Sequence, residues 1–304
     1  MSNHLAVQTH GEFPSLASRL IQLLYILCDD AIDYLLTLLT KKSKLERLLE
    51  RSDSARASRI LEVEEFLTRK LSHHSNRVFR NSADYDSILI EGSVAARGDR
   101  RNELKKRLET VVSTIDAYDD LKSKVESMRR EKYDSNNPSH EERLRDLWRL
   151  MVPSEVLEDR IGKQWRFIGF QGDDPATDFR GMGVLSLDQL IFLARNYPNE
   201  MQRMLGISHH PQMGFPLAVA GITFTAVTRH LLNSGKLKKL FYRSRDNMDM
   251  TLFNETYCAI FIKFVNFWQS ARPASVMEFN PIRANFERIL IDELSKENCD
   301  LAVQ

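Results

Sequence analysis

Apolar residues recur at spacings of three, four or seven along most of this chain, and this period constrains the fold more than any other feature. It is clearest between residues 99 and 131, at Leu104, Leu108, Val111, Ile115, Tyr118, Val125 and Met128. Such spacing places the apolar side chains on one face of an α-helix. No stretch alternates apolar and polar residues as a half-buried strand does. The sequence therefore predicts an all-α, multi-helix fold with no sheet.

Two later segments, 215–233 and 251–270, are apolar almost all round, which predicts the buried centre of a carboxy-terminal domain. Segment 99–131 fits either a bundle helix within the chain or a short coiled coil. The bundle helix is favoured, because the pattern lasts less than four heptads and Asp119 and Asp120 interrupt its second half. Ser186, with Gln189 three residues later, has the spacing of a capping box and predicts a helix start.

Domain organisation follows from length and from one polar segment. A chain of 304 residues is near the upper limit for a single core. Residues 133–142 carry Pro138 and no apolar period, which predicts a linker. We therefore expect an amino-terminal helical region over 1–132, a linker over 133–142 and a carboxy-terminal domain over 143–295.

The most apolar stretch, residues 16–39, carries three acidic residues near its centre, Asp29, Asp30 and Asp33. These carboxylates are costly in hydrocarbon and argue against a membrane span. The polar residues form one narrow stripe on an otherwise apolar helix, which predicts a mostly buried helix needed for folding. The alternative is a reversible anchor on a membrane surface.

Charge and cysteine content exclude several function classes. Lys and Arg total 43 against 42 Asp and Glu, so there is no global positive field for nucleic acid. The three cysteines form no CxxC pair, which is typical of a reducing, cytoplasmic compartment. The phosphate-binding GxxxxGK[ST], the GxSxG elbow and the zinc-binding HExxH are absent from the sequence. We expect no cofactor and no metal site of its own.

The stretch WRFIGFQGDDPATDFRGMG, Trp165 to Gly183, is the part of the chain most unlike an ordinary helix. Five of the chain's 12 glycines lie between Gly162 and Gly183, which predicts a shaped loop that presents something. On spacing alone, Arg180 could form a structural ion pair with Asp178. Asp173 and Asp174 fit either a Mg²⁺ site or solvated loop carboxylates, and the second is the better match.

This stretch resembles the signature of the ELMO-domain-containing (ELMOD) proteins, W-x3-G-[FW]-Q-x3-P-x-T-D-[FL]-R-G-x-G-x3-L-x2-L. The matching residues are Trp165, Gly169, Phe170, Gln171, Pro175, Thr177, Asp178, Phe179, Arg180, Gly181, Gly183, Leu187 and Leu190. Residues from about 143 to 290 also resemble the ELMO domain. The first 130 residues match less specifically.

The resemblance implies an all-helical fold and GTPase-activating protein (GAP) activity toward Arf-family small GTPases, including Arf-like members. It implies that Arg180 is a catalytic finger supplied in trans and that the chain hydrolyses no GTP itself. GTP and magnesium are then expected on the partner GTPase. We expect a cytoplasmic protein of membrane traffic, with peripheral contact with anionic intracellular membranes as a further candidate interaction.

The chemistry of GTP hydrolysis supports an arginine in this role. A planar guanidinium has several fixed donors that can neutralise charge on the transferring phosphoryl group, where lysine is a point charge. The other motif residues are expected to shape the loop; they are Trp165, Gly169, Phe170, Gln171, Pro175, Thr177, Asp178, Phe179, Gly181 and Gly183. Gln171 is also a weaker candidate for positioning the attacking water.

A basic stretch offers a candidate docking surface, formed by Lys236, Lys238, Lys239, Arg243 and Arg245. Its partner would be an acidic surface of the GTPase or anionic lipid, and the alternative is a solvated face. Two other classes of function stay open. One is a non-catalytic adaptor that only docks regulators of small GTPases. The other is a helical tether that dimerises through residues 99–131.

Overall fold

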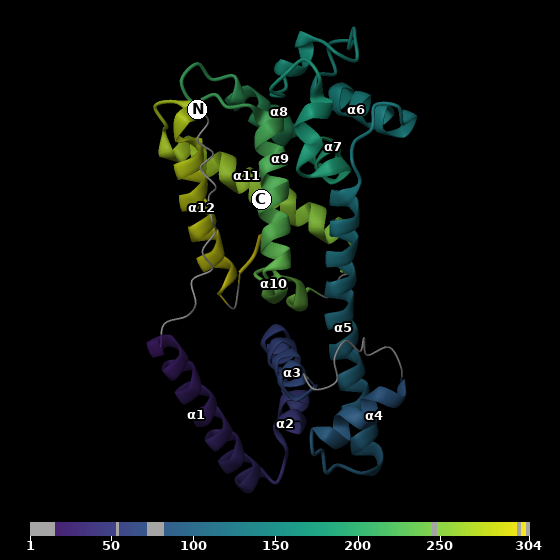
Figure 1. Ribbon diagram of the computed structural model, residues 1–304, viewed down its shortest axis with the longest axis vertical. Coiled ribbons are helices and arrows are strands. Elements are labelled where there is room, and N and C mark those ends of the chain that lie inside the picture. Colours follow the sequence, from purple (N-terminus) through teal and green to yellow (C-terminus); the bar gives the residue numbers. More distant parts are fainter. Residues whose placement is uncertain (1–15, 53–54, 72–81, 245–247, 297–298, 302–304) are drawn as a thin grey trace, which may run out of the picture. The chain divides into compact units, whose positions relative to one another are not determined.

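The computed structural model describes residues 16–52, 55–71, 82–244, 248–296 and 299–301, and its regular elements are helices (Figure 1). In chain order they are α1 (Leu16–Thr40), α2 (Lys44–Glu50), α3 (Arg56–Leu71), α4 (Ser82–Glu91), α5 (Gly98–Arg130), α6 (Pro138–Met151), η2 (Lys163–Arg166), η3 (Pro175–Arg180), α7 (Gly183–Asn196), α8 (Pro198–Ser208), α9 (Leu217–Asn233), α10 (Lys238–Arg243), α11 (Met250–Ala271), η4 (Val276–Glu278) and α12 (Phe279–Leu294). No strand occurs within these ranges, which confirms the all-α prediction. No helix within them is long and apolar enough to cross a bilayer.

The chain divides into two compact units. The first comprises residues 1–51 and 69–109, and the second comprises residues 52–68 and 110–304. Helices α3 and α5 each continue from one unit into the other. This division differs from the predicted boundary at 133–142.

The polar segment 133–142 belongs to the second unit and is mostly exposed, but its polar groups are ordered by local hydrogen bonds. Asn137 caps α6, and its side chain accepts a hydrogen bond from the Ser139 backbone N–H at 3.0 Å. His140 is buried, and its Nδ1 accepts from the Asp134 backbone N–H at 3.0 Å. The polar residues that predicted a linker therefore serve as a helix cap and a closed turn.

The first unit has a small core beneath α2. Its buried apolar residues come from α2, α4 and the start of α5, and include Leu45, Leu48, Leu49, Ile88, Leu89, Leu104 and Leu108. Arg100 on α5 pairs with both Glu46, at 2.9 Å, and Glu50, at 2.5 Å. Apolar burial and these pairs together join α2 to α5.

Helix α1 corrects the prediction of a mostly buried helix. Side chains are described from Cys28 onward, and the apolar ones are largely exposed, with Leu35 at 57% and Leu39 at 81%. The polar stripe faces the protein instead, since Asp29 and Asp33 pair with Lys44 and Arg47 of α2. The period located the stripe correctly, but the direction in which it points is the reverse of the one predicted.

The second unit is built around α9 and α11, which cross at its centre with α12 and α7 on either side (Figure 1). The ring of Phe224 on α9 lies 5.2 Å from Phe261 and 4.5 Å from Phe264 on α11. Both helices are buried over most of their lengths, which confirms the prediction for segments 215–233 and 251–270. Asp249 begins α11 by accepting hydrogen bonds from the Thr251 and Leu252 backbone N–H groups.

Helix α5 buries its apolar residues within the chain. In the second unit these include Val111, Val112, Tyr118, Leu121 and Val125. The Tyr118 hydroxyl donates to the Leu232 carbonyl at 2.7 Å. These contacts support the bundle-helix interpretation over an exposed coiled-coil seam.

Helix α7 begins three residues before the predicted capping box. Ser186 is buried inside the helix, and its hydroxyl donates to the Gly183 carbonyl at 3.0 Å. Gln189 is also fully buried. The capping-box prediction is therefore wrong, because the same residue spacing occurs here within a helix.

Candidate functional site

The motif stretch folds as two short 3-10 turns, η2 and η3, separated by a loop. Asp174 caps η3 by accepting a hydrogen bond from the Ala176 backbone N–H at 2.9 Å, and Pro175 occupies the first position of the turn. Arg180 is the last residue of η3. The turn therefore ends by presenting this arginine.

The side chain of Arg180 is exposed. Within the described part of the chain, its guanidinium makes no hydrogen bond or ion pair. Asp178, the expected ion-pair partner, instead accepts a hydrogen bond from the Gln171 backbone N–H at 2.9 Å. The structural ion pair predicted as the alternative is not formed, and the guanidinium points into solvent.

Buried aromatic rings hold the motif against α6. The Trp165 ring lies 5.6 Å from Trp148 of α6 and 5.8 Å from Phe170, in edge-to-face geometry. Phe170 lies 5.6 Å from Phe179 in the same geometry. Trp165 and Phe170 are buried as expected, at 0% and 3% exposure. Because Phe179 immediately precedes Arg180, this ring stack fixes the backbone from which the arginine extends.

Two glycines fix the ends of the motif against other helices. Gly169 has φ +90°, and a Cβ there would lie 2.1 Å from the Leu217 backbone N. Gly183 has φ +56°, and a Cβ there would lie 2.2 Å from the Glu131 carbonyl oxygen. Only glycine allows both the backbone conformation and the close approach at these positions. The loop is thereby joined to the start of α9 and the end of α5.

Gly181, which follows Arg180, is different. Its φ is −82°, an ordinary helical value, and a Cβ there would meet nothing within 4 Å. Neither its own conformation nor a neighbour among the described residues requires glycine. The space beside Arg180 is therefore open to an approaching partner.

Arg160 joins α6 to η3. Its guanidinium donates to Glu141 at 2.8 Å and to Asp174, the cap of η3, at 2.6 Å. It also lies 5.9 Å from the centre of the Tyr133 ring. Burial, together with the hydrogen bond that Tyr133 donates to Glu141, raises the pKa of the Tyr133 hydroxyl. This network holds the turn that carries Arg180.

The two carboxylates weighed as a Mg²⁺ site are both paired with arginines. Asp173 lies 2.9 Å from Arg166, and Asp174 lies 2.6 Å from Arg160. In the described ranges no three His, Cys, Asp or Glu side chains gather as metal ligands. The geometry gives Asp173 and Asp174 the role of loop-shaping residues.

The remaining motif side chains divide between the interior and the surface. Pro175 is buried, whereas Gln171 and Thr177 are exposed. The Thr177 hydroxyl donates to the Asp174 carbonyl at 3.0 Å, which closes the first part of η3. Gln171 and Arg180 are thus the exposed motif residues with side chains long enough to reach into a partner.

The predicted docking cluster, Lys236, Lys238, Lys239, Arg243 and Arg245, is largely used within the chain. Lys238 pairs with Glu64, and the Lys239 Nζ donates to the Ser295 carbonyl at 2.9 Å. Arg243 donates to the Cys299 carbonyl. Lys236 is exposed, and Arg245 lies outside the described residues. The structure brings the four described cations together around α10 but engages at least three of them internally.

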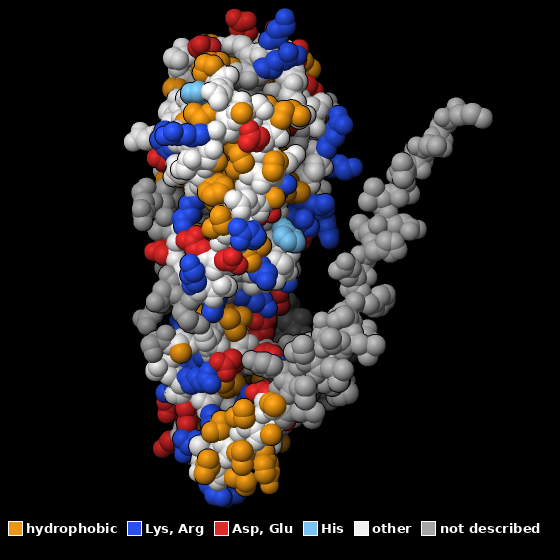
Figure 2. Space-filling model, turned by 90° about the vertical axis from the view of Figure 1, so that its left-hand side faces the viewer, with side chains coloured by type: hydrophobic (Ala, Val, Ile, Leu, Met, Phe, Trp, Pro, Cys, Tyr) orange, Lys and Arg blue, Asp and Glu red, His pale blue; other side chains and the backbone are white. Residues whose placement is uncertain are grey.

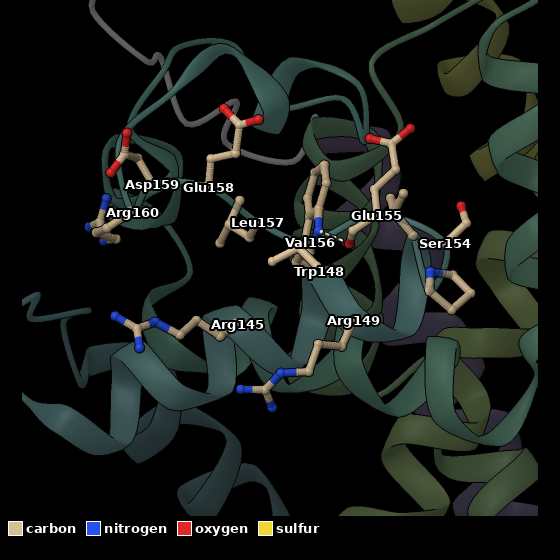
Figure 3. Close-up of a pocket in the computed structure, with 12 residues that line it drawn as sticks. Arg145, Trp148, Arg149, Ser154, Glu155, Val156, Leu157, Glu158, Asp159 and Arg160 are labelled. Carbon is tan, nitrogen blue, oxygen red and sulfur yellow. Dashed lines mark hydrogen bonds between the residues drawn. The ribbon is translucent and has the colours of Figure 1, made fainter.

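A groove beside the motif was missed by sequence reasoning. It lies between α6 and segment 152–160, has a volume of about 670 Å³, and is lined on the α6 side by Arg145, Trp148 and Arg149. Figure 3 shows the Arg145 and Arg149 side chains below the groove and acidic side chains above it. The Trp148 Nε1–H donates to the Glu155 carbonyl at 2.9 Å and holds the groove's far wall. Segment 152–160 has no apolar period, so no sequence pattern indicated the groove.

Comparisons with known proteins show which family this chain resembles. Residues 123–283 match the model of the ELMO/CED-12 family. ELMO domain-containing protein 2 of Mus musculus is 36% identical over 263 residues, which cover 84% of this chain and 88% of that protein. ELMO domain-containing protein 1 of Bos taurus is 33% identical over 301 residues, covering 90% and 89%. ELMO domain-containing protein B of Dictyostelium discoideum is 32% identical over 261 residues, covering 84% and 90%.

Proposed function

This chain belongs to the ELMO/CED-12 family, and we propose that it is a GTPase-activating protein for an Arf-family small GTPase, either Arf or Arf-like. In this proposal Arg180 enters the nucleotide site of the GTPase in trans. GTP and Mg²⁺ belong to the GTPase, and this chain hydrolyses no GTP itself. The reaction takes place in the cytoplasm, at the surface of an intracellular membrane.

The observation that carries the proposal is the exposed guanidinium of Arg180, which has no partner in the described part of the chain. A structural arginine in a shaped loop is normally paired, as Arg160 and Arg166 are. A guanidinium left in solvent on a turn held by buried rings and two glycine contacts is available to a second molecule. The proposal is therefore supported by the combination of a fixed η3 backbone and a free Arg180 side chain.

Phosphoryl transfer from GTP is favoured by a free guanidinium on a fixed backbone. As the bond to the γ-phosphoryl group breaks, negative charge develops on oxygens that water stabilises less well than fixed donors do. A guanidinium offers such donors in a planar fork. A backbone already held in place avoids reorganisation during the reaction. Gln171 is the second exposed long side chain of the motif and is proposed to orient the loop or the attacking water.

A non-catalytic adaptor is the second candidate, and the groove beside α6 is the observation that favours it. Apolar Trp148, Val152 and Leu157 line this groove between charged rims, as in a site for an extended peptide. An adaptor would bind its partner without changing the rate of GTP turnover. A measurement of the rate of GTP hydrolysis therefore distinguishes the two functions, whereas a measurement of binding to the GTPase does not.

The test is single-turnover GTP hydrolysis on a panel of Arf and Arf-like GTPases, with the full chain and with Arg180→Lys. We expect Arg180→Lys to keep its melting temperature and its affinity for the GTPase. The stimulated rate should fall by at least tenfold, since arginine fingers contribute about 10³- to 10⁵-fold. Arg288→Lys is the matched control, because Arg288 is an exposed arginine on α12 and its substitution should leave the rate unchanged.

Three results would contradict the proposal. One is an Arg180→Lys protein that stimulates hydrolysis as well as the parent chain. Another is a parent chain that binds a GTPase of the panel yet accelerates none of them, which would favour the adaptor. The third is loss of rate together with loss of thermal stability in Arg180→Ala, which would instead assign Arg180 a structural role.

A further inference from the structure

The described half of α1 exposes a continuous apolar face. Figure 2 shows it as a hydrophobic surface at the lower end of the view. The exposed apolar side chains are Ile32, Tyr34, Leu35, Leu36, Leu38 and Leu39. At about 100° per residue, the order around the helix is Tyr34, Leu38, Leu35, Leu39 and Ile32. Together these side chains cover an arc of about 160°. No charged side chain lies within this arc, and Asp30 lies just outside it.

The opposite side of α1 is fixed against α2. Asp29 accepts a hydrogen bond from Lys44 at 2.7 Å, and Asp33 pairs with Arg47. Arg47 also donates to the Thr37 hydroxyl at 3.1 Å. These contacts use Asp29, Asp33 and Thr37, whereas Asp30 beside them stays exposed. They hold α1 in the one rotation that leaves the apolar face outward.

We propose that α1 lies in the plane of a lipid bilayer surface, with this apolar face among the acyl chains. The arc is wider than the narrow seam that a single partner helix covers in a coiled coil. It has the wide apolar face and the polar opposite side that are typical of interfacial helices. Tyr34 lies at the edge of the arc, where an amphipathic ring suits the boundary between headgroups and acyl chains.

The charges around α1 indicate whether binding requires anionic lipid. Lys44 and Arg47, the cations beside the polar stripe, are neutralised by Asp29 and Asp33. Lys42 pairs with Glu50, and the exposed Lys41 at the end of α1 is offset by the exposed Asp30 on the same helix. Electrostatic attraction to anionic lipid is therefore weak in this region, and apolar burial is the main source of affinity. Vesicles of neutral phosphatidylcholine should suffice. This distinguishes α1 from the basic residues around α10, whose contact with a membrane would require anionic lipid.

The first test is flotation of the full chain with phosphatidylcholine vesicles, compared with Leu35→Asp/Leu39→Asp. Both residues are exposed, so the substitutions should leave the fold intact, as circular dichroism will verify. Two carboxylates placed in the acyl region should lower the partition coefficient by at least about tenfold. Ile90→Asp is the matched control, because Ile90 is an exposed apolar residue of α4 outside this face and should change partitioning less than about twofold.

The second test uses Cys28 as a reporter. Cys28 is exposed on α1, whereas Cys258 and Cys299 are buried, so a thiol-reactive environment-sensitive fluorophore will label Cys28. Its emission should shift to the blue when phosphatidylcholine vesicles are added. Light scattering of the unlabelled chain shows whether a second copy covers the face instead.

The inference is overturned if the parent chain fails to float, or if the Leu35→Asp/Leu39→Asp protein floats equally well. It is also overturned if two results occur together. In one, light scattering shows that the parent chain is a dimer and that the double substitution dissociates it. In the other, the emission of the fluorophore on Cys28 does not change when vesicles are added. The inference is independent of the proposed catalytic role. Stimulated hydrolysis in vesicle-free solution should be unchanged in the double variant, so failure of one idea leaves the other standing.

Discussion

Gly169→Ala is the substitution whose effect the structure defines most directly. Gly169 has φ +90°, and its added Cβ would lie 2.1 Å from the Leu217 N, 2.7 Å from the Pro216 C and 2.9 Å from the Ala218 N. All three are backbone atoms, so no side chain can rotate away. The start of α9 and the motif loop must therefore separate.

The energetic cost has two parts. An alanine held at this φ costs about 1–2 kcal/mol relative to glycine. Separation also breaks the hydrogen bonds from the Ala218 and Val219 backbone N–H groups to the Ile168 and Gly169 carbonyls, at 3.1 and 3.2 Å. Each contributes about 1 kcal/mol. The expected loss in the free energy of unfolding is therefore about 3–4 kcal/mol.

Urea denaturation followed by tryptophan fluorescence measures this loss. Trp148, Trp165 and Trp268 all lie in the second unit, so their emission reports the unfolding of that unit. With a slope of about 2–3 kcal/mol per molar urea, the midpoint should fall by about 1–2 M. Gly181→Ala is the control, and its midpoint should stay the same or rise slightly, because its site has space and an ordinary φ. Equal midpoints for the two variants would refute the argument.

Two further predictions concern carboxylates. Burial raises the pKa of Asp188, and Arg143, which donates to both carboxylate oxygens at 3.0 Å, opposes this effect. In Arg143→Gln the Asp188 pKa should rise further in a carboxyl carbon-13 NMR titration, and the loss of stability should be larger at pH 7 than at pH 4, where more of the carboxyl is protonated. Hydrogen bonds from Arg229 and Asn233 lower the pKa of Glu126 below 4.5, although burial partly opposes them. This stabilisation is present above pH 4.5 and is lost as the pH falls through the lowered pKa. Glu126→Gln should therefore melt below the parent chain at pH 7, and the difference in melting temperature should shrink as the pH falls below 4.5.

The central helices could be predicted because burial on all sides leaves a strong local pattern. Segments 215–233 and 251–270 correspond to α9 and α11 within two residues at each end. The motif loop was predicted in outline, since clustered glycines indicate special backbone geometry. Its partners could not be predicted. Gly169 meets Leu217 and Gly183 meets Glu131, and both contacts join segments far apart in the sequence.

The state of Arg180 shows a second limit of sequence reasoning. Its distance from Asp178 along the chain permits an ion pair, and the pattern alone cannot say which group a carboxylate will choose. In the folded loop the Gln171 backbone N–H binds Asp178, because the loop folds back between these residues. A buried or constrained backbone donor needs a partner, whereas an exposed guanidinium is solvated by water. Asp178 therefore accepts from the Gln171 backbone N–H, and Arg180 is left without a partner in the described part of the chain.

The same reasoning accounts for α1. A helical period identifies a polar stripe but not the direction in which that stripe points. A polar stripe that contacts a neighbouring helix has the same period as one that faces water. What decides the direction is charge on a neighbour. Asp29 and Asp33 are four residues apart on α1, and Lys44 and Arg47 are three apart on α2, so each set lies along one helix face. Paired in this way, the acidic residues turn inward and the leucines of α1 must face outward.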